Sequence, residues 1–508
     1  MDMRPVAVAP VAAALAALLA LSPSLAHAQD TTAVQPSSAV SSRLQPSSSP
    51  LTLEQAISLA QGQGYEGRAA RASLDAAEHR DGAFGAQFRP QLSLTGTVPS
   101  YNRRIVPVVQ PDGSTLFRSQ NQTNAGLTAT INQMLPTGGD LFVSSSLATY
   151  SLSGDQTIRT WSSTPVSVGI RQDIFRPNTV KLDRREQPVR TELASRQFLE
   201  AQEDIALRTT GLFFDLYRAG VALDNARKNA ATNDTLFTLN RGRYEVGKIG
   251  ENDLLQSELA LLRSRASLDE ARLVYDRAES ELRLALNLPA GTSIPLVVPG
   301  EAPAYAVDTA LAAAEATRNA AGMTSAELQR IMADRQITEA KLNSGIGASV
   351  SASVGFNATA PDLDLAYRDL LEARQVAVTV DVPLVQWGAR HHRVGAAQAE
   401  RERIENETQA SEAQIALDAR YAALELEQSR RNLAISAKAD TVAAKRFEVA
   451  YNRYVIGKIA IDNLYIAQAE KDQALEQYLQ AMRSHWLAHY RLRRLTLYDF
   501  AAGQPVGR

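Results

Sequence analysis

Residues 243–249 read Arg-Tyr-Glu-Val-Gly-Lys-Ile, and residues 453–459 read Arg-Tyr-Val-Ile-Gly-Lys-Ile. Such a near-copy within one chain of 508 residues indicates an internal duplication. Each copy lies between two long stretches in which apolar residues have helical spacing, and its glycine suits the left-handed turn that ends a helix. The repeated phrase therefore predicts the tips of two helical hairpins, one in each half of the chain.

The stretches before the tips are unusually long. Apart from Pro188, no proline interrupts residues 181–244 or 390–454, so each stretch can form a helix of about 95 Å at ~1.5 Å per residue. We expect the return helices at 252–288 and 462–497. Apolar residues step by threes and fours, as in helices that pair along a seam: Leu212, Leu216, Ala219 and Leu223; Leu255, Leu259, Leu262 and Ala266; Leu417, Tyr421 and Leu424; Leu475, Leu479, Met482 and Trp486.

Segments with a period of two precede each hairpin, and they predict strands. In these segments apolar residues alternate mainly with Ser, Thr and Asn. Alternation alone fits either a soluble sandwich or a membrane barrel with a Ser/Thr lumen. The segment from Gly126 to Tyr150 is an extra hairpin, which either adds strands to a barrel or lies outside the membrane. The predicted strands are 92–98, 127–132, 141–147, 166–174, 350–356 and 376–382, and further helices are expected at 53–84, with Thr52 as its cap, and at 309–342.

The N-terminus has the order of a secretory signal: Arg4, an apolar run over residues 11–21, and Ala26-His27-Ala28 before Gln29. The run is short for a membrane span of ~20 residues, which argues against an uncleaved anchor. We expect a signal peptide at 1–28, a disordered leader at 29–50, a first structural repeat at 51–288, a linker at 289–308, a second repeat at 309–497 and a C-terminal tail at 498–508.

Charge and composition exclude several classes of function. The 53 basic and 55 acidic residues are interspersed, so the sequence offers no bulk attraction for nucleic acid. The chain has no cysteine, which excludes disulfides, thiolate metal sites and a lipid anchor on an N-terminal cysteine. No phosphate loop, nucleophile elbow or dinucleotide fingerprint occurs in a fitting context. We therefore expect no enzyme, no catalytic residue and no cofactor.

Two histidine pairs are candidate metal ligands. His485 and His489 are four residues apart on one predicted helix, but the sequence places no third ligand near them, so a structural pair is the favoured interpretation. His391 and His392 are adjacent and cannot both face one ion. We therefore expect no metal site.

Taken together, these features resemble the TolC-type outer-membrane efflux proteins, or outer membrane factors. Besides the tip phrases, residues 381–390 (Asp-Val-Pro-Leu-Val-Gln-Trp-Gly-Ala-Arg) look like the family's strand-to-helix crossing, with residues 172–177 as a degraded first copy. The resemblance covers Leu51 to Leu497. It implies an α+β, mostly α fold: a homotrimer in which each chain gives four strands to an outer-membrane β-barrel of about twelve, continued by a long periplasmic α-helical coiled-coil barrel.

The resemblance also implies a function, that of the outer-membrane exit duct of a tripartite efflux or type I secretion system. Its partners would be a periplasmic adaptor, an inner-membrane transporter and outer-membrane lipid, but no nucleic acid. The adaptor would dock at the hairpin tips, formed by Val246, Gly247, Lys248, Ile456, Gly457 and Lys458. The sequence does not indicate the cargo.

Two further roles follow from the resemblance. The family's constriction carries an acidic residue six positions after the tip glycine; here that place holds Asp253 in the first half but Asn463 in the second, with Asp462 one residue earlier. An acid favoured by the helix dipole is the alternative for both aspartates. A latch between hairpins would use Arg243, Tyr244, Arg453 and Tyr454, for which a snorkelling base and an interface aromatic are the alternative.

Two other kinds of protein remain open on the residues alone. A periplasmic or secreted coiled-coil scaffold would use the same helices without a channel, and a plain porin would use the strands without the long helices. An open sheet in lipid leaves backbone groups unpaired. A channel built from this chain therefore requires further copies.

Overall fold

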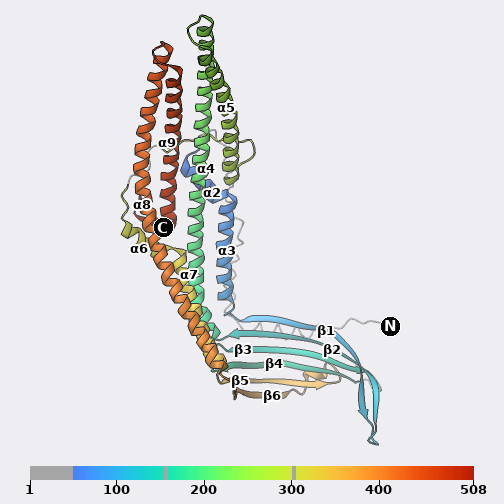
Figure 1. The fold of residues 1–508 in the computed structure, drawn as a ribbon. Coiled ribbons are helices and arrows are strands. Elements are labelled where there is room, and N and C mark those ends of the chain that lie inside the picture. The colour runs from blue at the N-terminus through green and yellow to red at the C-terminus, as the bar shows by residue number, and fades with distance from the viewer. Residues whose placement is uncertain (1–49, 154–157, 300–304, 508) are drawn as a thin grey trace, which may run out of the picture. The chain divides into compact units, whose positions relative to one another are not determined.

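The computed structural model describes residues 50–153, 158–299 and 305–507 (Figure 1). The predicted signal peptide and nearly all of the predicted leader lie outside the described residues. The chain divides into two compact units. The described residues of unit 1 fall within 82–185 and 334–398, and those of unit 2 within 46–81, 186–333 and 399–508.

Two helical hairpins account for most of unit 2. The outgoing helices, α4 (Thr179–Glu245) and α8 (Ala389–Val455), have 67 residues each and begin in unit 1. The return helices, α5 (Glu251–Ala285) and α9 (Ile461–Thr496), have 35 and 36 residues. These bounds confirm the four predicted helices to within about three residues, and Pro188 lies inside α4 without ending it.

Two helices that the sequence predicts as continuous are each broken once. The stretch expected at 53–84 forms α2 (Leu53–Gln63) and α3 (Tyr65–Ala86), which are separated at Gly64. A Cβ at Gly64 would lie 2.4 Å from the Ala60 carbonyl oxygen and 2.8 Å from that of Ala285, so this close approach requires glycine. The predicted cap is confirmed, because Thr52 and Gln55 form a reciprocal capping box at the start of α2.

The second break lies at Ala320, between α6 (Thr309–Asn319) and α7 (Ala321–Asn343). The backbone N–H of Ala321 donates to the Glu200 carboxylate on α4 at 3.0 Å. That contact satisfies a donor that a continuous helix would have bonded internally. It joins residues far apart in the chain, which is why local periodicity does not predict the break.

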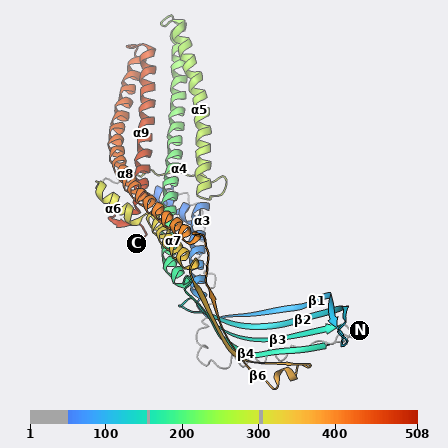
Figure 2. The same cartoon turned by 60° about the horizontal axis from the view of Figure 1, so that its bottom comes forward.

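Unit 1 contains an antiparallel sheet of six strands in chain order (Figures 1 and 2). Its edges are β1 and β6, since each strand pairs with its neighbours in sequence. The Gly126–Tyr150 segment supplies parts of β2 and β3 and lies inside this sheet, which therefore has two strands more than the four per chain that the resemblance implies for the barrel. The strands are β1 (Gln91–Val109), β2 (Thr115–Met134), β3 (Asp140–Ser153), β4 (Ile158–Ile174), β5 (Gly347–Ala360) and β6 (Leu371–Asp381).

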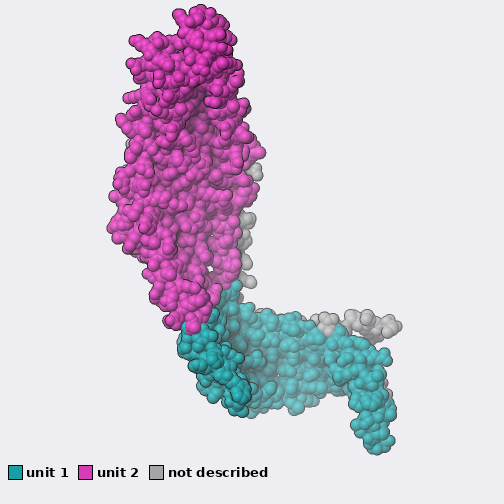
Figure 3. All heavy atoms as spheres, viewed as in Figure 1, with its two compact units in different colours: residues 1–45, 82–185, 334–398 teal, residues 46–81, 186–333, 399–508 magenta. Residues whose placement is uncertain are grey.

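The main core of unit 2, the magenta unit of Figure 3, forms where α2 packs against α4, α5 and α9. Phe213 and Phe214 of α4 are fully buried there, and Phe214 stacks on Trp486 of α9 with ring centroids 6.2 Å apart. Leu51 extends this packing, because its N–H donates to the Pro295 carbonyl at 2.7 Å. No helix among the described residues is both long and apolar enough to cross a membrane.

Described residues after α5 and after α9 make further contacts within unit 2. In the predicted linker, Leu296 forms a parallel β-bridge with Leu51, and the Tyr305 hydroxyl contacts His489 of α9. The last residues form a short hairpin of β7 (Tyr498–Asp499) and β8 (Gln504–Pro505), whose Asp499 accepts from Arg493 at 3.0 Å.

Candidate functional site

The two hairpin tips have the same backbone geometry. Gly247 and Gly457 have φ values of 70° and 74°, the left-handed conformation that glycine adopts without strain. In both tips the glycine N–H donates to the carbonyl of the tyrosine three residues earlier, at 2.8 and 2.9 Å, and the following lysine N–H donates to the carbonyl of the preceding arginine at the same two distances. These bonds close the end of each helix. The predicted turns at Gly247 and Gly457 are therefore confirmed.

Next to the tips, a contact joins the two hairpins of one chain. Arg243 on α4 donates from Nη2 to the Val455 carbonyl oxygen at 2.8 Å, and its guanidinium lies 5.4 Å from the centre of the Tyr454 ring. The Tyr454 hydroxyl donates to Asn240 Oδ1 at 2.7 Å. Asn240 and Tyr454 are both buried, so their hydrogen bond is shielded from water and is costly to leave unmade.

Only half of the predicted latch residues take part in this contact. The structure brings Arg243 and Tyr454 together, while Tyr244 and Arg453 are exposed. The repeat itself does not predict this asymmetry. Its source is visible in the partners: Asn240 precedes Arg243 by three residues, whereas the residue three positions before Arg453 is Ala450, which has no side-chain acceptor.

The candidate constriction residues lie in the first turns of the return helices. Asp253 belongs to α5 and is half-buried, whereas Asp462 and Asn463 belong to α9 and are exposed. Asp462 accepts from Gln256 Nε2 of α5 at 2.5 Å. The two return helices of one chain therefore meet just beyond the tips, and Gln256 is a participant that the sequence did not suggest.

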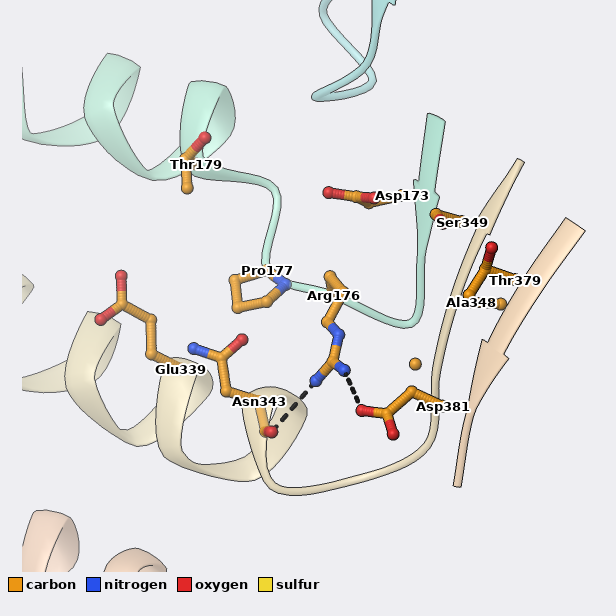
Figure 4. A pocket seen from close by; sticks show the side chains of 11 residues that line it. Asp173, Arg176, Pro177, Thr179, Glu339, Asn343, Ala348, Ser349, Thr379 and Asp381 are labelled. Atoms are coloured by element: carbon orange, nitrogen blue, oxygen red, sulfur yellow. Dashed lines mark hydrogen bonds and ion pairs between the residues drawn. The ribbon is translucent and has the colours of Figure 1, made fainter. Parts of the chain in front are cut away.

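A second cluster of interest lies in unit 1, where the strands pass into helices (Figure 4). The phrase at 172–177 joins β4 to α4, and the phrase at 381–390 joins β6 to α8, which confirms both as strand-to-helix crossings. Arg176 of the first phrase donates from Nη2 to Asp381 of the second at 2.9 Å, and from Nη1 to the Asn343 carbonyl at 3.0 Å. The pocket around Arg176 has a volume of about 370 Å³. Its central ion pair ties the two crossings together.

The crossing at β6 also carries exposed apolar side chains. Trp387 is 94% exposed and has a positive φ of 48°, and Leu384 is 89% exposed. Exposure of so much apolar side-chain surface to water is unfavourable. Such residues are typical of the interface between a membrane and water.

The histidine pair on α9 has structural partners. His489 Nδ1 lies 2.7 Å from the Tyr305 hydroxyl, and His485 Nδ1 lies 3.0 Å from Ser429 Oγ. Both rings are buried. Within the described part of the chain, no group of three or more His, Cys, Asp or Glu residues could hold a metal ion.

Burial of His489 predicts a dependence of stability on pH. Desolvation lowers the pKa of His489 to about 4, with Arg493 acting in the same direction. The unfolded chain binds this proton near pH 6.5, so the free energy of unfolding should fall as pH drops from about 6.5 to 4, by up to about 3 kcal/mol. Melting temperatures measured at pH 7 and pH 5 test this expectation.

The matched variant for that measurement is His489→Gln, which can still bond to Tyr305 but cannot be protonated. Its melting temperature should change less with pH than that of the wild type. Glu203, whose pKa is raised by burial, acts in the opposite sense but is common to both proteins. Equal slopes in the two proteins would contradict the role assigned to His489.

This chain is similar to known proteins in structure rather than in sequence. No protein-family model matches the sequence, and no curated protein matches it. The CmeC outer membrane channel of Campylobacter jejuni superposes with a TM-score of 0.65 at 13% identity, over 90% of this chain and 87% of that one. This chain has the fold of an outer-membrane channel.

Two further channel structures agree. The outer membrane protein VceC of Vibrio cholerae gives a TM-score of 0.64 at 13% identity, covering 89% of this chain and 96% of its own. The open-state MtrE outer membrane channel of Neisseria gonorrhoeae gives 0.59 at 13% identity, covering 87% and 88%. The similarity to outer-membrane channels therefore extends over about nine-tenths of this chain.

Proposed function

We propose that this chain is the outer-membrane exit duct of a tripartite efflux or type I secretion system in a Gram-negative bacterium. It would act as a homotrimer that passively conducts cargo from a periplasmic adaptor and an inner-membrane transporter to the exterior. The observation that carries the proposal is the outer-membrane channel fold, which covers about nine-tenths of the chain in the CmeC comparison. The proposal is not an enzymatic one, since the chains of this fold named above are channels and membrane proteins.

The exposed apolar face of the sheet supports contact with lipid. Leu92 and Leu94 on β1 and Val376, Val378 and Val380 on β6 are all well over half exposed. Neighbouring residues on the same strands are mainly polar or small. This division is the one expected of strands with lipid on one side and a wet lumen on the other.

Uncovered helix faces support assembly with further copies. The predicted seam on α4 is largely buried, as expected for contacts within the chain. The corresponding stripes on α5 and α8, however, remain exposed: Leu255, Leu259 and Leu262, and Leu417, Tyr421 and Leu424. Stripes of this kind are typical of surfaces that pack on a neighbouring helix. A second and a third copy would cover them.

We assign the tips two roles within this function. Val246, Gly247 and Lys248, with Ile456, Gly457 and Lys458, would form the docking surface for the adaptor, and the contact of Arg243 with Tyr454 would hold the tips closed. Asp253, repeated in each copy, would place negative charge at the constriction and attract cations. Asp462 already accepts a hydrogen bond from Gln256 and is therefore the weaker candidate for the constriction.

The test is single-channel conductance of the detergent-extracted protein in a planar bilayer. The wild type should show a small, cation-selective conductance that divalent cations on the periplasmic side reduce. Asp253→Ala should lower cation selectivity and weaken the divalent block by about tenfold, because the charges that attract the cation are gone.

The matched control is Asp269→Ala, which removes an aspartate from the same helix about 24 Å farther from the tip. It should leave both selectivity and block unchanged. If the Asp253→Ala channel has the same selectivity and block as the wild type, Asp253 does not form the constriction. No insertion of the wild type into bilayers would overturn the channel itself and favour a periplasmic scaffold.

A further inference from the structure

We propose that the β2–β3 hairpin adds two strands to the membrane barrel. Each chain then contributes six strands, and three chains close a barrel of about 18 strands. This inference rests on the proposed function and specifies the barrel beyond it. The alternative is that the extra hairpin lies outside the membrane, which would leave four strands per chain. The observations that separate the two concern the faces of the sheet, the turn of the hairpin and its place in the strand order.

The two faces of the sheet remain distinct across the extra hairpin. Register places Leu92, Ile131, Val143, Val168 and Val354 in one row across β1 to β5, and the row ends at Arg374 on β6. The adjacent row, on the opposite face, consists of Ser93, Thr130, Ser144, Ser167, Gly355 and Ala373. Strands β2 and β3 thus continue the apolar row and the small polar row without exchanging faces. A hairpin that lay in water on both sides would not need this division.

The turn between β2 and β3 is fitted to the crossing into α4. Asn178, next to the start of α4, donates to the Pro136 carbonyl at 2.9 Å and accepts from the Lys181 N–H at 2.9 Å. A Cβ at Gly139 would lie 2.5 Å from the Arg171 carbonyl oxygen. The turn is therefore held at the helical end of the sheet, level with the crossing that carries Arg176. This is where the short turn of a membrane hairpin belongs.

The position of the hairpin within the sheet excludes a peripheral role. β2 lies between β1 and β3, and β3 lies between β2 and β4. If β2 and β3 were outside the membrane, β1 and β4 would lie in lipid with their hydrogen-bonding edges apart and unpaired, at several kcal/mol for each group. The edges available to a neighbouring copy are β1 and β6.

The enlarged barrel has a physical consequence. Barrel diameter grows roughly in proportion to strand number, so about 18 strands give an outer opening about 1.5-fold wider than 12 strands would. Barrels of 16–18 strands leave an aqueous channel rather than a core filled with side chains. The small polar row faces that opening.

Single cysteine substitutions test directly whether each chain contributes six strands to the barrel, because the chain has no cysteine of its own. The pairs are Ile131→Cys and Thr130→Cys on β2, and Val143→Cys and Ser144→Cys on β3. Each variant is reconstituted into liposomes and treated with a charged, membrane-impermeant maleimide. Thr130→Cys and Ser144→Cys should react at least about tenfold faster than their neighbours, since a thiol in lipid is neither ionised nor reached by the reagent.

The control pair is Val354→Cys and Ser353→Cys on β5, a strand that belongs to the barrel under either alternative. If the labelling rate alternates on β5 but is equal on both faces of β2 and β3, the proposal of six barrel strands per chain is overturned, while the proposed channel function still stands. No alternation on any strand would mean that the proposed function itself is wrong.

Native mass spectrometry of the detergent-extracted protein then fixes the number of copies. Three copies, together with alternation on β2 and β3, give about 18 strands. Two copies would close only about 12 strands and would overturn the enlarged barrel.

Discussion

Replacing Arg243 with alanine is expected to raise the open-channel conductance of the protein, or the fraction of time it spends open, more than any other substitution at the tips. The variant loses the hydrogen bond to the Val455 carbonyl and the contact with the Tyr454 ring. Together these contacts stabilise the joined tips by about 1–2 kcal/mol. A loss of that size changes the ratio of open to closed tips roughly 5–30-fold.

Two variants make this expectation specific to the contact. Tyr454→Phe keeps the ring but removes the hydroxyl that donates to buried Asn240, so it should act in the same direction and less strongly. Arg241→Ala removes an exposed arginine two residues away on the same helix and should leave gating unchanged. If Arg243→Ala and Arg241→Ala have equal conductance and open probability, the contact does not hold the tips closed.

Phe214→Ala is expected to have the largest effect on stability. The side chain is fully buried, meets Phe213 edge-on at 5.6 Å between centroids and stacks on Trp486. Truncation of a buried phenylalanine costs about 3–5 kcal/mol, because apolar burial is lost and a cavity remains. In a protein of this size the melting temperature should fall by about 5 °C or more, as measured by circular dichroism in detergent.

Phe214→Leu is the graded control for that measurement. It retains most of the buried volume, so the expected loss is less than half of that in Phe214→Ala. Equal losses in the two variants would show that the stacking on Trp486, rather than the filled volume, accounts for the stability.

Local sequence signals predicted those parts of the fold that local physics determines. The glycines at the tips, the long proline-poor helices and the crossings at 172–177 and 381–390 each depend on residues within a few positions of one another. The breaks at Gly64 and Ala320 also involve distant partners, because the Ala285 carbonyl lies against Gly64 and the Glu200 side chain accepts from the Ala321 N–H. No short window of sequence contains those contacts.

The same reason limited the prediction of the sheet and the site. The far ends of β1 and β2 are held by their mutual pairing, from Asn102–Gln122 to Val109–Thr115, in a stretch whose residues do not alternate cleanly. At the tips, the sequence indicated Arg243 and Tyr454 as candidates but not that they contact each other. It gave no indication of Asn240, because an asparagine inside a long helix has no signature until its partner from the other hairpin is known.

The two tips of this chain are alike in backbone and different in side chains, and they belong to one polypeptide. If a gene encoded a single hairpin that assembled with itself, every substitution would appear at every tip at once. Here a mutation at Asn240 leaves Ala450 as it is, and one at Asp253 leaves Asn463 as it is. Natural selection can therefore change the side chains and the charge at one tip without changing those at the other, while the shared glycine turns keep both in the same shape.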